Sequence, residues 1–380
     1  MDNTKSISIY IHIPFCRAKC FYCDFNSFAC RDEFVPAYFN ALKKEIDLYA
    51  GKLKAYTIKT VFIGGGTPSV VDSQYIYEVL KLLNQKLNID VKAEISIETN
   101  PGTLTYEKLE TYKAIGVNRL SIGLQAWQDR ILKMLGRIHT AKEFEDNFRL
   151  ARKAGFENIN VDLIFGIPDQ TFKDWCETLE NVISLGPEHL SCYSLKIEEG
   201  TVFGDKLENN ELVPLEDIID REMYSYCKDY LAQKGYKHYE ISNFAKPGYE
   251  CRHNLVYWKQ QEYIGLGAGA HSFFEGTRVN NIYDIEGYIA SLLEDKIPAE
   301  NAEFIDRKLD MTEFMILGLR LMDGVLPDDF KKRFDEDIYD VYGSEIAKLV
   351  ERGLLVKKGG AISLSSAGLD FANQVFMEFV

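Results

Sequence analysis

Three cysteines near the amino terminus have the spacing of a metal-binding loop. They stand at Cys16, Cys20 and Cys23, a C-x3-C-x2-C pattern that directly follows an apolar, β-branched run. Three thiolates on one short loop can hold three irons of a cubane iron–sulfur cluster, which leaves the fourth iron open to a small-molecule ligand. Such an open iron can bind a substrate and deliver an electron to it. A single zinc ion is the alternative, but it needs a fourth ligand that this motif does not supply.

Glycine and polar residues follow several other apolar runs. The glycines at 64–66, followed by Thr67, close the second run, and they let the backbone pass close to a ligand. Glu98, Gln125 and Asp162 lie at or near the ends of three further runs. Polar groups at the same end of parallel strands converge on one mouth, where carboxylates can hold ribose hydroxyls or an ammonium group. These residues therefore predict a ligand site shared with the cysteine loop.

The elements that position these residues alternate in a βα pattern. Short apolar runs predict strands over 7–13, 60–63, 93–98, 119–123, 159–165 and 190–195. Amphipathic spacing predicts helices over 33–50, 73–87, 105–114, 129–135, 141–154 and 173–185. The fold class is therefore α/β with a parallel sheet. Six units are fewer than the eight of a complete barrel, so a partial (β/α)6 barrel and an open sheet both fit the pattern.

Two further regions follow the βα units. After residue 197 the pattern changes to a long helix over 213–234, a strand over 236–242 and a glycine-rich, aromatic segment. From about residue 306, three helices precede two short strands, an order that resembles a winged helix. We expect a barrel over 1–200, an accessory region packed on it over 201–300, and a winged-helix-like C-terminal domain over 301–380.

Composition limits the possible partners and compartments. The 380 residues are 46% hydrophobic and 27% charged, which is typical of a globular protein with a large core. The net charge of −14, with ten basic and fourteen acidic residues over 306–380, argues against nucleic-acid binding. Eight cysteines are too few for a disulfide scaffold, and no apolar run is long enough to span a membrane. Because the first residues also lack a signal peptide pattern, we expect a cytoplasmic protein.

The cysteine motif resembles that of the radical S-adenosylmethionine (SAM) enzymes. The residues around it, from Tyr10 to Phe25, resemble the oxygen-independent coproporphyrinogen III oxidase family more narrowly, and within it the HemW heme chaperones. The resemblance extends from residue 7 to the C-terminal helices. It implies a partial barrel of the radical SAM type with a [4Fe–4S] cluster on Cys16, Cys20 and Cys23. It also implies SAM at the open iron and an electron donor for the cluster.

The same resemblance implies which residues contact SAM. They are Tyr10, Tyr22, Gly65, Gly66, Thr67, Glu98, Gln125, Arg137 and Asp162. In the family, the glycine run contacts the amino group of the methionine moiety, and the aromatic residue at the position of Tyr22 lies beside the adenine.

Two features bear on the choice between the chaperones and the oxidases. The oxidases carry a further cysteine two residues after the third, and this chain has Phe25 there. The sequence from His253 to Trp258 matches the H-N-x-x-Y-W motif of the chaperones. The imidazole of His253 can ligate heme iron, and the aromatic residues can cover a flat macrocycle. The alternative to heme ligation is that His253 is a structural histidine, hydrogen-bonded between two domains. His271 is a second candidate heme ligand.

The sequence therefore predicts a heme chaperone that hands heme to an acceptor protein, with the cluster and SAM regulating the transfer. The first alternative is an oxidase that decarboxylates coproporphyrinogen III to protoporphyrinogen IX. A zinc-stabilised binding module is the remote alternative. No residue is assigned a catalytic role, and the C-terminal domain is expected to dock on the barrel or on a partner protein.

Overall fold

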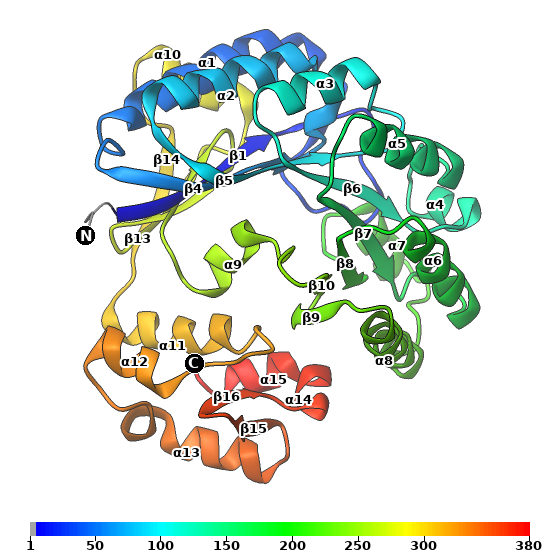
Figure 1. Ribbon diagram of the computed structural model, residues 1–380, viewed down its shortest axis with the longest axis vertical. Helices are drawn as coiled ribbons and strands as arrows, with labels where there is room; N and C mark the ends of the chain where they lie inside the picture. Colours follow the sequence, from blue (N-terminus) through cyan, green and yellow to red (C-terminus); the bar gives the residue numbers. More distant parts are fainter. Residues whose placement is uncertain (1–4) are drawn as a thin grey trace.

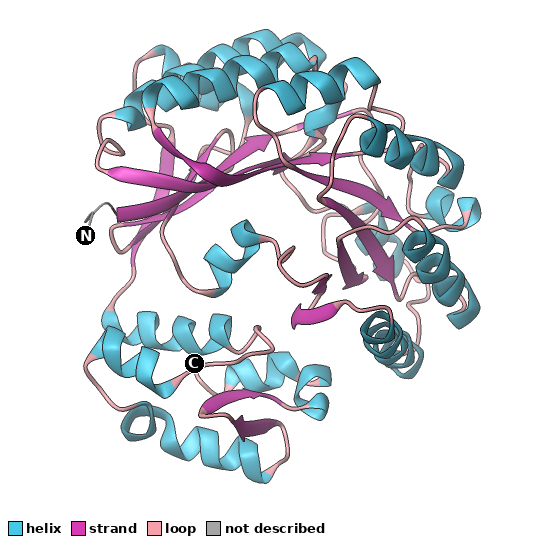
Figure 2. Cartoon of the chain, in the orientation of Figure 1, coloured by secondary structure: helices cyan, strands magenta, loops and turns pink. Residues whose placement is uncertain are grey.

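The computed structural model describes residues 5–380. It contains one large twelve-stranded sheet, whose strand order is β14-β13-β12-β11-β1-β4-β5-β6-β7-β8-β10-β9. Helices cover the outer face of this curved sheet, and a C-terminal unit lies on the opposite side (Figure 1). Figure 2 shows the same arrangement with the strands in magenta and the helices in cyan.

The six predicted strands form the parallel centre of the sheet. They are β1 (Lys5–Ile13), β4 (Tyr56–Gly65), β5 (Asn88–Thr99), β6 (Arg119–Gln125), β7 (Ile159–Phe165) and β8 (His189–Ser194). Neighbours in this series pair in parallel throughout. The six helices that were predicted are α1 (Val35–Ala50), α2 (Ser73–Lys86), α3 (Tyr106–Ala114), α4 (Asp129–Met134), α5 (Ala141–Lys153) and α6 (Phe172–Ser184). The prediction of an α/β protein built from six βα units is confirmed.

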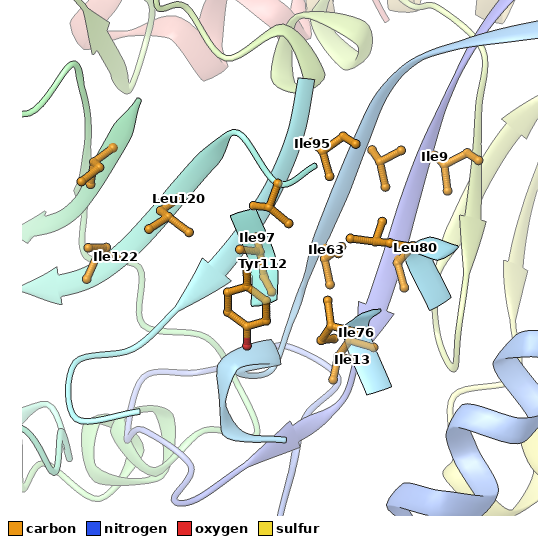
Figure 3. Packing of buried hydrophobic residues seen from close by; sticks show 14 of the residues in the cluster. Ile9, Ile13, Ile63, Ile76, Leu80, Ile95, Ile97, Tyr112, Leu120 and Ile122 are labelled. Atoms are coloured by element: carbon orange, nitrogen blue, oxygen red, sulfur yellow. The ribbon is translucent and has the colours of Figure 1, made fainter. Parts of the chain in front are cut away.

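Strict alternation gives the two faces of the parallel strands different chemistry. In β1, the four isoleucines at 7, 9, 11 and 13 are buried, while Ser8, Tyr10 and His12 point to the opposite face. Figure 3 shows the apolar face, where Ile9, Ile63 and Ile97 pack with Ile76 and Leu80 of α2. The inner face instead carries polar side chains, and many of them are buried. This polar interior needs hydrogen-bond partners, and it determines where a site can form.

Residues 201–300 pack on the barrel through α8 and also extend its sheet. They include α7 (Val202–Glu208), α8 (Asp217–Gln233), α9 (Arg252–Trp258) and α10 (Ile285–Leu293). Their strands do not pack on the side of the barrel but extend the sheet at both edges. β9 (Lys237–Glu240) and β10 (Asn243–Ala245) add to β8. β11 (Tyr263–Leu266), β12 (His271–Phe274), β13 (Thr277–Asn281) and β14 (Ala299–Phe304) add to β1. The physical reason is that an open sheet leaves unpaired backbone groups at its edges, and further strands satisfy them.

The C-terminal unit has its own hydrophobic core, which includes Met315, Phe330, Ile346 and Ile362. Its elements are α11 (Arg307–Gly318), α12 (Pro327–Phe334), α13 (Ile338–Glu351), β15 (Leu355–Lys358), β16 (Ala361–Leu364), α14 (Ser366–Asp370) and α15 (Ala372–Met377). Three helices followed by a two-stranded hairpin is the order predicted from the sequence.

This unit docks on the barrel through backbone hydrogen bonds beside β9. Ile241 N donates to Arg320 O at 3.1 Å, and Met322 N donates to Tyr239 O at 3.0 Å. Helix α9 lies between the sheet and the unit (Figure 1). Across residues 5–380, no helix has both the length and the apolar character needed to cross a membrane.

Candidate functional site

A cavity of about 480 Å³ lies at the carboxyl ends of the parallel strands, within the size range of small-molecule sites. Eleven of the residues predicted for cluster and SAM binding line it: Cys16, Cys20, Tyr22, Cys23, Gly65, Gly66, Thr67, Glu98, Gln125, Arg137 and Asp162. They come from the cysteine loop, from the ends of β4, β5, β6 and β7 and, for Arg137, from the segment between α4 and α5. The structure therefore brings residues up to 146 positions apart in the sequence to one mouth.

Each thiol of the cysteine loop has a polar contact that restrains its position. Thr67 Oγ1 lies 3.5 Å from Cys16 Sγ, and Ser27 Oγ lies 3.9 Å from Cys23 Sγ. Arg137 Nη1 donates to Cys20 Sγ at 3.4 Å. Burial raises the pKa of the Cys16 and Cys23 thiols, which favours their protonated forms when no metal is bound. Because a thiol binds metal as a thiolate, these two cysteines must release their protons when a metal binds.

The arrangement of the three thiols fits a cubane cluster. In a cubane, each thiolate binds a different iron, so the three sulfurs surround a shared volume instead of meeting at one point. A loop with three cysteines on one cavity therefore suits an iron–sulfur cluster better than a single zinc ion.

The glycine run is packed against the beginning of the cysteine loop. A Cβ at Gly66 would lie 2.7 Å from Phe15 O and 3.0 Å from Cys16 Sγ. Gly65 has a φ of +111°, and a Cβ there would lie 2.5 Å from the His12 ring. Glycine is required at both positions, because any side chain would displace the cysteine loop or β1. Gly65 and Gly66 both line the cavity.

Two partly buried carboxyl groups, Glu98 and Asp162, face the cavity from β5 and β7. Glu98 Oε2 accepts a hydrogen bond from Gly65 N at 3.1 Å. Burial, assisted by the nearby charge of Asp162, raises the pKa of Glu98 to about 8. Asp162 accepts hydrogen bonds from Ser121 Oγ at 2.9 Å and from Asn160 Nδ2 at 2.8 Å. A carboxyl pair held in this way is suited to a ligand that brings positive charge and hydroxyl donors.

Arg137 joins the cysteine loop to the strand ends. Besides its bond to Cys20, its Nη2 donates to Asn100 Oδ1 at 2.8 Å and to Gly123 O at 2.7 Å. These three contacts fix the guanidinium in the wall of the cavity. Gln125, on the same strand as Gly123, has a φ of +74°, an uncommon conformation for a residue with a side chain. It falls at a register irregularity between β6 and β7.

One residue predicted to contact SAM does not line the cavity. Tyr10 does not line the cavity, and its hydroxyl lies 3.0 Å from His12 Nδ1. His139, two residues after Arg137, is buried with Nε2 3.2 Å from Leu124 O. Cavity residues that the sequence analysis did not select include Asn100, Ile164, Tyr193, Leu195 and Lys196. Tyr193 and its neighbours stand at the end of β8, so the rule used for Glu98 would have found them.

His253 is buried on the inner face of the sheet, with 1% of its surface exposed. Its Nδ1 lies 2.7 Å from Thr60 Oγ1 and its Nε2 lies 2.9 Å from Tyr257 OH, so both ring nitrogens have partners. The ring stacks on Phe62 with centroids 5.2 Å apart, and burial lowers its pKa to about 3. His271 is exposed, with Nε2 3.2 Å from Tyr283 OH. The assignment of either histidine to heme stays a prediction.

Comparison with known proteins agrees with this geometry. Residues 10–182 match the family model of the radical SAM superfamily, and residues 305–371 match that of the HemN C-terminal domain. The structure resembles coproporphyrinogen III oxidase (HemN) from Escherichia coli, with a TM-score of 0.87 and 24% sequence identity. That match covers 100% of this chain and 91% of the other. Fold and site together define a radical SAM protein, a family whose members carry a [4Fe–4S] cluster and SAM.

Sequence relatives narrow the assignment. The protein named heme chaperone HemW from Bacillus subtilis (strain 168) is 37% identical, over 98% of this chain and 99% of its own. Its namesake from Lactococcus lactis subsp. lactis (strain IL1403) is 36% identical, over 99% and 98%. The namesake from Escherichia coli (strain K12) is 40% identical over 71% of each chain. The chain therefore belongs to the HemW heme chaperone family, as the motifs predicted.

Proposed function

We propose that this protein binds heme and delivers it to an acceptor protein, and that a [4Fe–4S] cluster and SAM regulate the transfer. The observation that carries the proposal is similarity along almost the whole chain to proteins named heme chaperones. When bound, the cluster supplies an electron that can cleave the sulfonium of SAM. The chain's own residues hold the ligands and keep water out of the cavity.

We assign roles within the cavity to its lining residues. Cys16, Cys20 and Cys23 hold the cluster, and Arg137 donates to the thiolate of Cys20. Glu98 and the backbone of the glycine run receive the ammonium of SAM, Asp162 and Gln125 hold its polar groups, and Tyr22 lies beside the adenine. Tyr10 acts from behind the cavity wall through His12, whose Nε2 bonds to Asn26 O at 2.7 Å.

Phe25 supports transfer of heme over decarboxylation of a porphyrinogen. Its side chain lines the cavity and is 62% exposed, so the phenyl ring is accessible to a ligand. The oxidases that this chain resembles carry a cysteine there. An exposed phenyl ring can cover part of a flat, apolar macrocycle but cannot ligate a metal or transfer hydrogen as a thiol does.

We also propose that His253 ligates the heme iron after a local rearrangement. In the structure, ligation would first break its bonds to Thr60 or Tyr257. Helix α9, which carries it, lies beneath the C-terminal unit, where Arg320 stacks 4.3 Å above the ring of Trp258. Heme uptake through His253 therefore requires α9 to move, and we expect slow uptake that is limited by this opening.

The proposal further includes an electron donor protein and a reducing cytoplasm. All eight cysteines are free thiols, and Cys30 is exposed. Free, exposed thiols persist in reducing compartments, where reductants for the cluster are also present.

Anaerobic reconstitution tests the cluster assignment. The reconstituted wild type should hold about four iron and four sulfide ions per chain. Cys20→Ser should lose most of them, while the control Cys176→Ser, away from the cavity, should keep them. A full cluster in Cys20→Ser would contradict the ligand assignment.

Two parallel assays test the function. Hemin titration should show saturable binding to the wild type and a changed Soret spectrum in His253→Ala, but not in His238→Ala, a partly buried histidine outside the motif. Incubation with coproporphyrinogen III, SAM and reductant should give no multiple turnover. Accumulating protoporphyrinogen would overturn the chaperone proposal. An unchanged spectrum in His253→Ala would remove only the assignment of the ligand.

A further inference from the structure

A chain of buried hydrogen bonds runs from the cavity into the inner face of the sheet. It begins at Asp162, whose Oδ1 accepts from Asn160 Nδ2 at 2.8 Å. Asn160 Oδ1 lies 2.6 Å from His189 Nδ1, and His189 Nε2 lies 2.8 Å from Tyr239 OH. Three strands, β7, β8 and β9, each contribute to this part of the chain.

The chain continues from β9 to helix α9. Tyr239 OH accepts from Cys251 N, the residue before α9, at 3.3 Å. Glu94 on β5 caps the first turn of α9. Its carboxylate accepts hydrogen bonds from Arg252 N at 3.0 Å and from His253 N at 3.1 Å. The Cys251 thiol also donates to Glu94 at 3.6 Å. The two ends of the chain are therefore a residue proposed to hold SAM and the residue proposed to hold heme.

Donor and acceptor roles along this chain have one consistent direction. The amide of Asn160 must donate through Nδ2 to the carboxylate of Asp162, so its Oδ1 accepts from His189 Nδ1–H. Burial holds the pKa of His189 well below its usual range, so the ring is neutral and Nε2 accepts from the Tyr239 hydroxyl. The oxygen of Tyr239 accepts from Cys251 N. No member can reverse its role without leaving a buried group unpaired.

Burial makes this chain sensitive to displacement. Asn160, His189, Tyr239, Glu94 and His253 are all buried, so no solvent water is available to replace a lost partner. Leaving a buried donor or acceptor unpaired costs about 1–3 kcal/mol. A movement of α9 that exposes His253 must break bonds in this chain, and a ligand that fixes Asp162 makes that movement more costly.

We propose that this chain couples the SAM site to His253, so that SAM binding holds α9 in place and weakens heme binding. The inference deepens the proposed function and rests on it. It gives SAM a regulatory role, in which arrival of SAM favours release of heme. Residues Asn160, His189 and Tyr239 are positioning residues, since they touch neither of the two proposed sites' ligands.

Linked binding measurements test this inference. Hemin affinity of the reconstituted protein is measured with and without SAM, anaerobically and without reductant, so that SAM is not consumed. We expect SAM to weaken hemin binding by at least about fivefold, the lower end of typical coupling between sites. Hemin must then weaken SAM binding by the same factor, because coupling is reciprocal.

A variant that removes one atom of the chain identifies the route. Tyr239→Phe breaks the bonds to His189 and Cys251. It should bring the coupling factor close to one, and it should strengthen hemin binding in the absence of SAM because α9 then moves more easily. The matched control is Tyr236→Phe, a buried tyrosine on the same segment whose hydroxyl donates to Pro187 O at 2.5 Å. That control should keep the wild-type coupling.

The outcomes are distinguishable. Direct competition of hemin and SAM for one cavity would leave the coupling intact in Tyr239→Phe, and this overturns the inference. A wild-type hemin affinity that SAM leaves unchanged or tightens also overturns it, whether or not the variant folds. Absence of hemin binding to the wild type would instead overturn the proposed function itself.

Discussion

The carboxyl group of Glu98 is mostly protonated at neutral pH before a ligand arrives. Burial raises its pKa to about 8, with Asp162 contributing the second effect. A positively charged ammonium favours the ionised carboxylate, so the pKa falls when SAM binds. The residue therefore couples SAM binding to release of a proton.

We predict that SAM binding at pH 7 releases most of one proton from wild-type protein. Isothermal titration calorimetry in buffers of different ionisation enthalpy measures this number directly. Glu98→Gln should bind SAM more weakly and release no proton from this site. The control Glu94→Gln alters a buried carboxylate outside the cavity, and it should leave the release unchanged. Equal proton release in wild type and Glu98→Gln would contradict the role of Glu98.

Most cavity residues could be predicted from the sequence because their signal is local. The cysteine spacing, the glycine run and the polar strand ends are each visible within a few residues. Tyr193 and Lys196 were missed because their segment has no motif, only a place at a strand end. The surroundings of His253 could not be predicted, since its partner Thr60 lies 193 positions away.

At the scale of elements, the turn between β4 and the short 3-10 helix η2 (Pro68–Val70) determines where the cysteine loop lies. Gly66 N donates to Ile13 O at 2.9 Å, and Thr67 N donates to Phe15 O at 2.8 Å. The turn is therefore bonded to the strand end that leads into Cys16. Its close contact depends on the missing side chain at Gly66.

We predict that Gly66→Ala prevents most cluster assembly, because its Cβ would lie 2.7 Å from Phe15 O. Relief of this overlap should cost about 1–3 kcal/mol of folding stability as the loop shifts. Iron and sulfide analysis after reconstitution, with thermal unfolding, measures both effects. Gly51→Ala is the control, since a Cβ there meets nothing within 4 Å. Normal cluster content in Gly66→Ala would show that the loop tolerates the shift.

Helix α1 is joined to the segment after β11 by one buried carboxyl group. Glu45 accepts hydrogen bonds from Gly267 N at 2.8 Å, Tyr288 OH at 2.6 Å and Asn281 Nδ2 at 2.6 Å. Burial nevertheless raises its pKa to about 7, above the usual value of 4.5. The folded state thus holds this proton more tightly than the unfolded state does.

The sign of the resulting pH effect follows from linkage. Because the folded pKa is raised, the stability contributed by the protonated form is complete below about pH 4.5 and is lost as pH rises to about 7. We predict that wild type loses on the order of 3 kcal/mol over this interval relative to Glu45→Gln. Urea unfolding at several pH values measures the difference. Asp47→Asn, an exposed change on the same helix, should not alter the slope.

The six βα units could be predicted because their strands and helices are long enough to show a clear apolar or amphipathic pattern. Of the strands that extend the sheet, β9 lies within the strand predicted over 236–242, but β10 to β14 were not predicted, because they contain only three to six residues each. Such short runs carry little periodicity. Their pairing is also distant in sequence, since β11 joins β1 across the whole length of the βα units.

At the scale of the whole molecule, the two units meet at a cation held between an aromatic ring and a carboxylate. Arg320 lies 4.3 Å from the centroid of the Trp258 ring, and its Nη2 lies 3.9 Å from Glu240 Oε2. Glu240 is fully buried, and burial raises its pKa while Arg320 opposes the shift. The seam therefore includes this charged contact, and Arg278 of β13 adds an ion pair to Glu313 of α11 at 2.7 Å.

We predict that Arg320→Ala weakens docking of the C-terminal unit by about 3–5 kcal/mol, because it leaves a buried carboxyl group without its cation. Calorimetry should show a separate, earlier transition for residues 305–380. Arg352→Ala removes an exposed pair with Glu378 and should change stability by less than about 1 kcal/mol. A single, unchanged transition in Arg320→Ala would show that the backbone bonds at β9 are sufficient for docking.

The order of elements in the C-terminal unit could be predicted, but its place on the barrel could not. Docking uses the backbone groups of Tyr239, Ile241, Arg320 and Met322. Every residue carries such groups, so the sequence contains no signal for this backbone part of the contact, and the side-chain pairs such as Arg320 with Glu240 join residues far apart in the sequence.

The open sheet also bears on self-association. Its edge at β9 is covered in part by a β-bridge between Glu240 and Leu321, whereas β14 forms the other edge with all six residues exposed. That strand contains Glu300 and Glu303, and strands with several charges pair poorly with a second copy because like charges would face each other. The two glutamates thus disfavour aggregation through the free edge of the sheet, although neither lines the cavity.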